Sequence, residues 1–317
     1  MTTADRSAFG DDTQSLKVAR TIDTGFFWLT AFFALAIAGI LLWIVYELFT
    51  IAWPAIQKFG LEFLTSSRWN PVENIYGALP QIYGTIISSI IALLVAVPLG
   101  VGVAIFLSED FLPSKVVTPI AFLIELLAAV PSVVYGLWGI FVFIPFITPF
   151  LDFIHTTLGW IPIFSTPPSS RAMIHAGLVL AIMISPIIIS ISRDTLASLP
   201  PQLRQGSLAL GATRWETILQ VLIPAGLSGI IGSIMLALGR ALGETMAAAM
   251  LIGNANKISI SWFDPASTIA SLIANQFAEA SGLQVSSLLY AGLVLMLLTL
   301  AVNVLAEIIV SRFQEVE

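Results

Sequence analysis

The sequence of 317 residues is 57% hydrophobic and 10% charged, whereas soluble domains are about 45–50% apolar and about 25% charged. This composition excludes a soluble globular protein and indicates a membrane protein. The net charge of -6 comes from scattered acidic residues and identifies no particular partner. The absence of cysteine excludes disulfides, thiolate metal sites and cysteine nucleophiles.

Apolar stretches close to the roughly 20 residues that cross a bilayer predict six transmembrane helices. The polar leader, residues 1–24, lacks the basic start and the cleavage site of a signal peptide, so we expect a cytoplasmic tail followed by a retained first span. The third stretch contains Pro131 and Pro145, but each half is too short to span alone, so one kinked helix is predicted. The predicted spans lie at about residues 25–49, 82–107, 116–147, 173–192, 227–252 and 286–310.

The distribution of lysine and arginine predicts the orientation, because short loops rich in them stay in the cytoplasm. Six spans place both termini on the same side of the membrane, and this side carries more basic residues than the other. The sequence therefore predicts cytoplasmic termini and a longest cytoplasmic loop at 193–226. The basic residues on that side are Arg6, Lys17, Arg20, Lys115, Arg193, Arg204, Arg214 and Arg312, against Lys58, Arg68, Arg171 and Lys257 on the other.

Motifs for catalysis and nucleotide binding are missing from the sequence. No G-x-x-x-x-G-K-[ST] occurs, so ATP-driven transport would need another chain to bind ATP. No G-x-S-x-G, H-E-x-x-H or Ser/His/Asp arrangement occurs, which disfavours an intramembrane hydrolase. His155 and His175 have no carboxylate or second histidine at ligand spacing, so we interpret them as solvated or interfacial. We therefore expect neither an enzyme nor a metal site.

The predicted cytoplasmic loop contains a helix–turn–helix pattern, "QGSLALGATRWETILQVLIP", at residues 205–224. Pro200 and Pro201 favour a turn before a new helix. Residues 201–210 can form a short helix that Gly211 ends, followed by a second helix from Thr213. The apolar side chains of this loop can enter a groove of another protein, or the loop can rest on the membrane surface as an amphipathic connector. Leu203, Leu208 and Leu210 form the apolar knob.

This stretch resembles the cytoplasmic-loop signature of the permease subunits of bacterial ABC importers, which reads E-A-A, three residues, glycine, nine residues, then I-x-L-P. Gly211 stands at the conserved glycine, and Val221, Ile223 and Pro224 stand at the last conserved places. The glutamine in place of the signature glutamate weakens any ion pair expected from that position. The resemblance implies that the loop couples to a cytoplasmic ATPase through Gln205, Gly206, Ser207, Leu208, Gly211 and Pro224.

A second stretch, "LGRALGETMAAAMLIGN" at residues 238–254, is similar to the fifth span of the phosphate-importer permeases of the PstC family. This resemblance implies a transmembrane permease domain over 25–317 in a bacterial plasma membrane, with no cofactor of its own. It also implies a PstA-like second permease subunit, a PstB-like ATPase dimer that binds ATP and Mg²⁺, and a PstS-like external phosphate-binding protein.

Two charges lie near the middle of the predicted fifth span. A lone charge at bilayer depth costs at least ~2.5–3.5 kcal/mol, so Arg240 and Glu244 should face protein or water. Their spacing of four places them on one helical face. Gly239 and Gly243 form an adjacent strip of small residues, which would let another helix approach closely. The sequence therefore predicts an interface or a water-filled path at these residues.

Both charges suit a phosphate path. The planar donors of Arg240 can grip two oxygens, and the Glu244 carboxylate can accept a hydrogen bond from the hydroxyl of hydrogen phosphate, which sulfate lacks. The alternative is that Glu244 only neutralises Arg240 through an intrahelical bridge. Glu125, in the third stretch, is another candidate for the path, although a structural partner for a neighbouring helix is favoured.

The sequence predicts an ATP-driven importer permease for inorganic phosphate. A permease for another oxyanion, sulfate or molybdate, and an ion-coupled secondary anion carrier that uses the Arg240–Glu244 pair are the alternatives. A subunit that senses phosphate without carrying it also stays open. A secondary carrier would have inverted repeats, and the sequence shows no convincing internal repeat.

Overall fold

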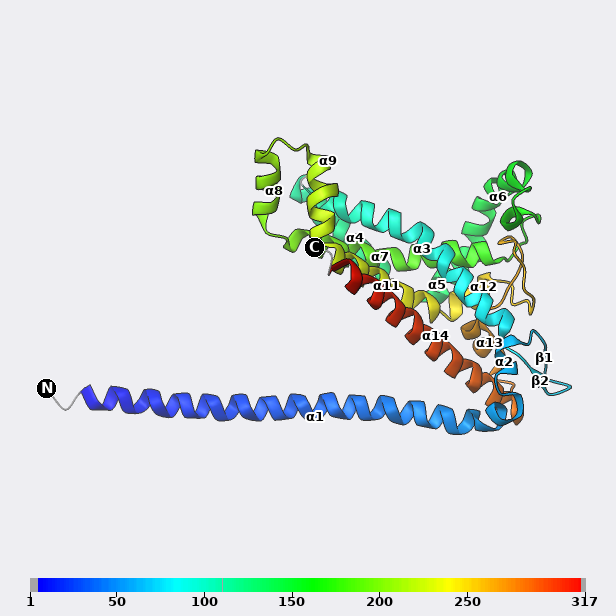
Figure 1. Cartoon of the computed structure of the whole chain (residues 1–317), viewed down its shortest axis with the longest axis horizontal. Coiled ribbons are helices and arrows are strands. Elements are labelled where there is room, and N and C mark those ends of the chain that lie inside the picture. Colours follow the sequence, from blue (N-terminus) through cyan, green and yellow to red (C-terminus); the bar gives the residue numbers. More distant parts are fainter. Residues whose placement is uncertain (1–4, 110, 315–317) are drawn as a thin grey trace. The chain divides into compact units, whose positions relative to one another are not determined.

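The structure, a computed structural model, describes residues 5–109 and 111–314, with side chains described for 23–109, 111–113 and 115–308. Residues 1–4 and 315–317, at the ends of the predicted tail and permease domain, lie outside the described residues. The chain divides into two units, Met1–Ile51 and Ala52–Glu317. Helix α1 (Asp5–Phe59) begins in the first unit and ends in the second (Figure 1).

The first unit is the larger part of α1. The section Asp23–Phe59 is long and apolar enough to cross a membrane, and none of its most apolar window is buried inside the chain. Phe26, Leu35 and Trp43 are all more than half exposed. Such a continuous apolar surface suits lipid rather than water. The predicted first span, 25–49, falls within this helix.

The second unit begins with a small cap built on aromatic residues. Helix α2 (Glu62–Thr65) is followed by the antiparallel strands β1 (Trp69–Asn70) and β2 (Ile75–Tyr76). Phe63 is fully buried and stacks on Tyr290, with ring centroids 4.4 Å apart. This cap and the α8–α9 turn lie at opposite ends of the second unit (Figure 1).

Helices make up most of the remaining second unit, and short breaks separate several of them. Two of these elements are π-helical turns: η1 directly precedes α6, and η3 directly precedes α10. The elements are α3 (Leu79–Ser108), α4 (Ser114–Ala128), α5 (Ser132–Trp138), η1 (Gly139–Phe143), α6 (Ile144–Leu158), η2 (Pro162–Phe164), α7 (Met173–Ser198), α8 (Pro201–Ala209), α9 (Arg214–Thr217), η3 (Ile218–Leu222), α10 (Ile223–Ala225), α11 (Leu227–Leu242), α12 (Met246–Leu251), α13 (Ile269–Gln276) and α14 (Leu283–Gln314).

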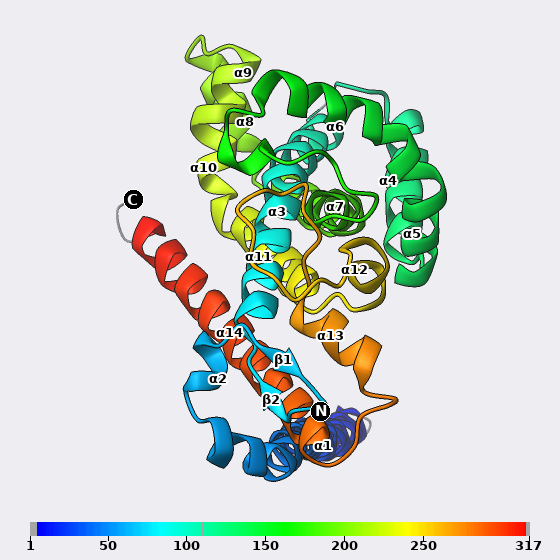
Figure 2. The same cartoon turned by 90° about the vertical axis from the view of Figure 1, so that its right-hand side faces the viewer.

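Helix α7 is the centre of the core. Figure 2 looks along α7, with α3, α4, α5, α11 and α12 around it. A Cβ at Gly177 would lie 2.5 Å from Ile91 Cγ2, and one at Gly100 would lie 2.8 Å from Ile188 Cγ2. The two glycines, one on each helix, therefore allow α3 and α7 to approach closely over much of their length.

The number of candidate spans agrees with the sequence. Five helical segments of the described chain are long and apolar enough to cross a membrane, and a sixth span exists if the bent pair Arg214–Ala225 and Leu227–Leu242, at 69°, counts as one. The prediction of an all-α membrane protein of six transmembrane helices is thus confirmed with one bent span. The five segments are Asp23–Phe59, Leu79–Ser108, Ser132–Leu158, Met173–Ser198 and Leu283–Ile308.

The prediction of one helix over 116–147 is wrong. The chain leaves the helix after Ala128 and resumes it at Ser132. Pro131 has no N–H to donate and restricts the residue before it, so the helix ends there. Pro145 lies in the first turn of α6, where a missing N–H is tolerated. The second half is not too short, because it continues to Leu158.

Candidate functional site

The predicted path residues lie at a break in the fifth span. Helix α11 ends at Leu242, and α12 begins at Met246. Arg240 lies in the last turn of α11, where a positive charge offsets the negative end of the helix dipole. Glu244 lies in the break and accepts a hydrogen bond from the backbone N–H of Ala247, 3.2 Å from Oε1. Glu244 therefore satisfies one of the N–H groups that the start of α12 leaves without a helical partner.

The predicted placement of Arg240 and Glu244 on one face of a continuous helix is wrong. Arg240 belongs to α11 whereas Glu244 lies in the break before α12, and no ion pair joins them in the described chain. Glycine is unfavourable in a helix interior by about 1 kcal/mol relative to alanine. Gly243, which follows Leu242, allows the helix to end there, and the side chain of Glu244 then bonds to the backbone of α12. The intrahelical bridge is therefore not present in this structure.

Arg240 faces outward from this chain and lies near the break in the third span. Its side chain is exposed, and its charge acts on the Tyr135 hydroxyl. That hydroxyl donates a hydrogen bond to the Leu127 carbonyl, 2.9 Å away, and so joins α5 to the last turn of α4. No sequence motif marks Tyr135, because only the fold brings it close to Arg240.

The small-residue strip has no packing partner in the described chain. A Cβ at Gly239 would meet no atom within 4 Å, and one at Gly243 would meet only the Gly239 carbonyl, 3.5 Å away. Helix α12 approaches α5 instead, at Gly136, where a Cβ would lie 2.6 Å from the Met250 sulfur. Helix packing at Gly239 and Gly243 stays a prediction that requires another chain.

Glu125 is also exposed. It lies on α4 and makes no hydrogen bond or ion pair with the residues that the structure describes. Phe122 and Leu126, on the same helix, are 58% and 48% exposed. A carboxylate among lipid-facing residues is unfavourable unless protein or water covers it. Glu125 therefore needs a neighbour from outside this chain.

The two histidines differ from each other in environment. His155 is half-buried, and its Nδ1 lies 2.9 Å from the Phe164 carbonyl. His175 is fully buried in α7 and neither ring nitrogen has a hydrogen-bond partner in the described chain. The interpretation of His175 as solvated or interfacial is therefore wrong, because Ile91 of α3 packs at the start of α7 and the carbonyls of Trp262 and Asp264 bond to it.

The coupling loop has the predicted helix–turn–helix geometry. Helix α8 ends at Ala209, and Gly211 has φ +90°. The N–H of Gly211 donates to Leu208, at 3.0 Å, and that of Ala212 donates to Ser207, at 3.2 Å. This pair of bonds is a Schellman motif with glycine in the left-handed position. The prediction that Gly211 ends the first helix is confirmed.

The second helix of the loop begins at Arg214, one residue after the predicted Thr213, which is its N-cap. Thr213 caps α9: its hydroxyl accepts from the backbone of Glu216, and the Glu216 carboxylate accepts from the backbone of Thr213 at 2.7 Å. Ser207 then joins the two helices, because its hydroxyl lies 3.0 Å from that of Thr217. The hydrogen bonds fix α8 at a defined angle to α9.

The exposed face of the loop carries most of the predicted coupling residues. Gln205, Gly206 and Leu208 are exposed, and Leu210 is 92% exposed. Leu203 instead packs on the chain's own cluster of Leu196, Ile218, Leu222 and Ile230, so it is not part of an outer knob. Trp215, at 58% exposure, adds an apolar side chain to the face. Pro224 lies in α10, directly before the bend into α11.

Comparison with known proteins places this arrangement in a family. Residues 96–315 match the family described as binding-protein-dependent transport system inner membrane component. The phosphate transport system permease protein PstC of Haemophilus influenzae is 44% identical over 299 residues, which cover 93% of this chain and 95% of that protein. PstC of Mesorhizobium japonicum is 45% identical over 272 residues, which cover 84% and 83%.

A solved structure shares the fold. A chain of the inward-facing MetNI methionine ABC transporter superposes with a TM-score of 0.52 at 17% identity, over 75% of this chain and 94% of that one. This low identity supports the fold alone, while the matches in sequence support the closer grouping. The chain belongs to the family of binding-protein-dependent transport system inner membrane components and, within it, to the PstC permease group.

Proposed function

We propose that this chain is a membrane-spanning subunit of an ATP-driven importer of inorganic phosphate and forms the translocation path with a second permease subunit. The observation that carries the proposal is the 44% identity with a phosphate transport system permease over 95% of that protein's length. The α8–α9 turn supports ATP-driven transport, since it presents a defined surface outside the apolar spans. The alternative functions are a permease for sulfate or molybdate and an ion-coupled carrier, and measurements of phosphate uptake distinguish them.

The energy for transport comes from a partner. The sequence has no phosphate-binding loop for a nucleotide, so ATP and Mg²⁺ bind to a PstB-like ATPase dimer. The exposed face of α8, with Leu208 and Leu210, enters a groove of this ATPase as a short helix. Gln205 lies on that face, and its neutral amide can donate and accept hydrogen bonds where the family signature has a charged glutamate. The chain itself is not an enzyme and binds no cofactor.

The path lies between this chain and a PstA-like second permease subunit. Arg240 and Glu125 are exposed in the single chain, and Gly239 borders open space. All three therefore require protein or water from outside the chain. A partner helix that packs at Gly239 would bring its own side chains beside Arg240 and complete the path.

Arg240 is the transient anion site. Its guanidinium presents several donors in one plane, which matches the oxygens of phosphate. Arg240 is not tied to Glu244 in this structure, so an anion does not have to break an ion pair between them. Tyr135, whose hydroxyl is within the electrostatic reach of Arg240, forms part of the wall.

Glu244 provides the selection for a protonated oxyanion. One of its oxygens accepts from Ala247, and a carboxylate has further lone pairs to accept a hydroxyl from hydrogen phosphate. Sulfate has no such donor at neutral pH, so it would leave this carboxylate acceptor unpaired beside the path. The Glu244 carboxylate therefore has two roles: it stabilises the start of α12, and it accepts a hydrogen bond from the hydroxyl of the substrate.

The orientation follows from the basic loops. Cytoplasmic termini in a bacterial plasma membrane place the α8–α9 turn beside the ATPase. The aromatic cap with β1 and β2 then faces outward, where a PstS-like binding protein delivers phosphate. Lys58 and Arg68 lie at that outer end, in agreement with its lower number of basic residues.

Radiolabelled phosphate uptake tests the proposal. Cells that lack their own phosphate systems would express this chain with its encoded neighbours, with either the wild-type ATPase or an ATPase that binds but does not hydrolyse ATP. We expect uptake that requires ATP hydrolysis and resists excess sulfate. Uptake with the inactive ATPase would contradict the proposal and support a secondary carrier. Competition by sulfate or molybdate would support another oxyanion, and the absence of uptake would support a sensory subunit.

A further inference from the structure

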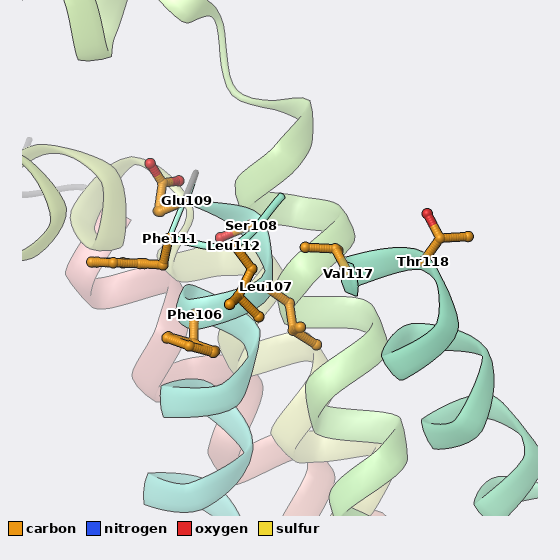
Figure 3. Close-up of a pocket in the computed structure, with 8 residues that line it drawn as sticks. All are labelled: Phe106, Leu107, Ser108, Glu109, Phe111, Leu112, Val117 and Thr118. Atoms are coloured by element: carbon orange, nitrogen blue, oxygen red, sulfur yellow. The ribbon is translucent and has the colours of Figure 1, made fainter. Parts of the chain in front are cut away.

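The guanidinium of Arg204 joins three helices at the α8–α9 end of the second unit. Arg204 belongs to α8, and it holds the Glu109 carboxylate at the end of α3 through Nε, 3.0 Å from Oε2, and Nη2, 2.7 Å from Oε1. The same guanidinium donates to the carbonyls of Leu196, at 2.8 Å, and Leu199, at 3.3 Å, where α7 ends. Figure 3 shows Glu109 and Phe111 on the turn after α3.

The ion pair between Arg204 and Glu109 is largely shielded from solvent. The side chains of Arg204 and Glu109 are only 24% and 10% exposed. Glu109 directly follows the last turn of α3, where the helix dipole disfavours a negative charge, so the carboxylate depends on its cation. Two parallel hydrogen bonds also fix the angle between the planes of the two groups. The pair therefore resists both separation and rotation.

Aromatic contacts hold the same turn to α9. The Phe111 ring lies 5.6 Å from the Phe106 ring and 5.6 Å from the Trp215 ring. The Arg214 guanidinium lies 4.9 Å from the Phe111 ring centroid. A cavity of about 310 Å³, lined in part by Glu109, Arg204 and Arg214, remains beside the ion pair. Direct packing between α8 and α3 is therefore incomplete, and the charged pair makes the connection.

We propose that Glu109 and Arg204 form a positioning pair that transmits the displacement of α8 to α3 and α7 together. The inference rests on the proposed function, in which α8 is the helix that the ATPase moves. Helix α7 is joined to α8 by the short backbone connection at Leu199 and Pro200, whereas α3 is joined to α8 by side-chain contacts such as this ion pair. The close approach of α3 and α7 at Gly100 and Gly177 then carries a movement at their ends into the core.

The test compares phosphate uptake with ATP consumption in the same sample. The full complex with Glu109→Gln or Arg204→Lys would be purified and placed in vesicles. Arg204→Lys keeps the charge but cannot make the fork of hydrogen bonds. We expect ATP hydrolysis within about twofold of the wild type and phosphate transported per ATP lower by about tenfold, the effect of losing one charged hydrogen bond. Asp194→Asn is the matched control, because it breaks the pair between Arg193 and Asp194, 3.0 Å apart, in which the Asp194 side chain is 67% exposed.

A double variant separates transmission from folding. Glu109→Met with Arg204→Met replaces the pair by apolar side chains of similar length, which often preserves stability. We expect this complex to assemble and to keep the low ratio of phosphate to ATP. A wild-type ratio in the assembled single or double variants would overturn the proposal. Failure of all three variants to assemble, while the Asp194→Asn complex assembles, would also overturn it and make the pair a folding element. If the wild-type complex itself shows no ATP-dependent uptake, the proposed function fails instead.

Discussion

Glu244 bonds to the backbone N–H of Ala247, 3.2 Å from its Oε1, and thereby stabilises the first turn of α12. The N–H groups at a helix start have no helical acceptor, and a negative charge also offsets the positive end of the helix. The carboxylate thus has a bond of its own that does not involve Arg240. The two residues can consequently be tested separately.

For Glu244, the informative change is Glu244→Gln. The glutamine oxygen can still accept from Ala247, so we expect α12 to form and phosphate uptake to continue at a reduced rate. The amide can also donate to an oxyanion without a hydroxyl, so inhibition by sulfate should strengthen about tenfold. Competition curves with unlabelled sulfate measure this change. Glu279→Gln, an exposed acid between α13 and α14, is the control. Uptake that still ignores sulfate would refute the role of Glu244 in selection.

Arg240→Gln tests the anion site. We expect uptake to fall by at least about tenfold, because a neutral amide makes weaker hydrogen bonds to phosphate than a guanidinium does. The complex should assemble normally, since the Arg240 side chain is exposed in this chain. Uptake and the yield of co-purified subunits are the two measurements. Arg193→Gln is the control at an arginine of α7 whose side chain is 26% exposed, and wild-type uptake by the Arg240 variant would remove Arg240 from the path.

Local signals were sufficient to predict four of the spans and the helix–turn–helix of the loop. Gly211 was identified as a helix end because a left-handed residue there favours glycine, and Pro201 marks the first turn of α8. Each signal depends on neighbours in the sequence. Hydrophobic runs of sufficient length likewise predicted these four spans without knowledge of their packing.

The breaks inside the spans were harder to predict. The run that contains Gly243 is apolar on both sides, and one glycine is tolerated in many helices. Helix α11 ends there because the Glu244 side chain bonds to the backbone of α12. That bond depends on the folded geometry. The contacts of Tyr135 and the pair Glu109–Arg204 also depend on tertiary structure. Glu109 and Arg204 are 95 residues apart and belong to no common motif.

Gly211 ends α8 in the left-handed conformation, which alanine tolerates poorly. At Gly211, φ is +90° and alanine would be strained by roughly 1–2 kcal/mol. We expect Gly211→Ala to tilt α8 against α9 and to lower the yield of ATPase that co-purifies with the permease. Gly102→Ala is the control, because Gly102 is helical, lies in α3 outside the loop, and a Cβ there meets no atom within 4 Å. Equal ATPase yields from both variants would show that the left-handed turn is not needed for coupling.

Helices α3 and α7 pack closely at Gly177. A Cβ at Gly177 would lie 2.5 Å from Ile91 Cγ2 and 2.7 Å from Ile91 Cβ, so the two helices must separate. Overpacking of this kind costs about 1–3 kcal/mol, and we expect Gly177→Ala to lower the unfolding temperature of the detergent-purified complex. The variant should also lower uptake, because the separated helices no longer move together.

Gly102→Ala provides the matched comparison on α3. Gly102 is helical as well, but a Cβ there meets no atom within 4 Å, so alanine should raise the stability of the helix by about 0.4–1 kcal/mol. The two substitutions add the same methyl group and differ only in the space that receives it. An unfolding temperature for Gly177→Ala at or above that of Gly102→Ala would contradict the close approach of α3 and α7. Unchanged uptake by a destabilised Gly177→Ala complex would instead separate the packing of these helices from the transmission of movement through them.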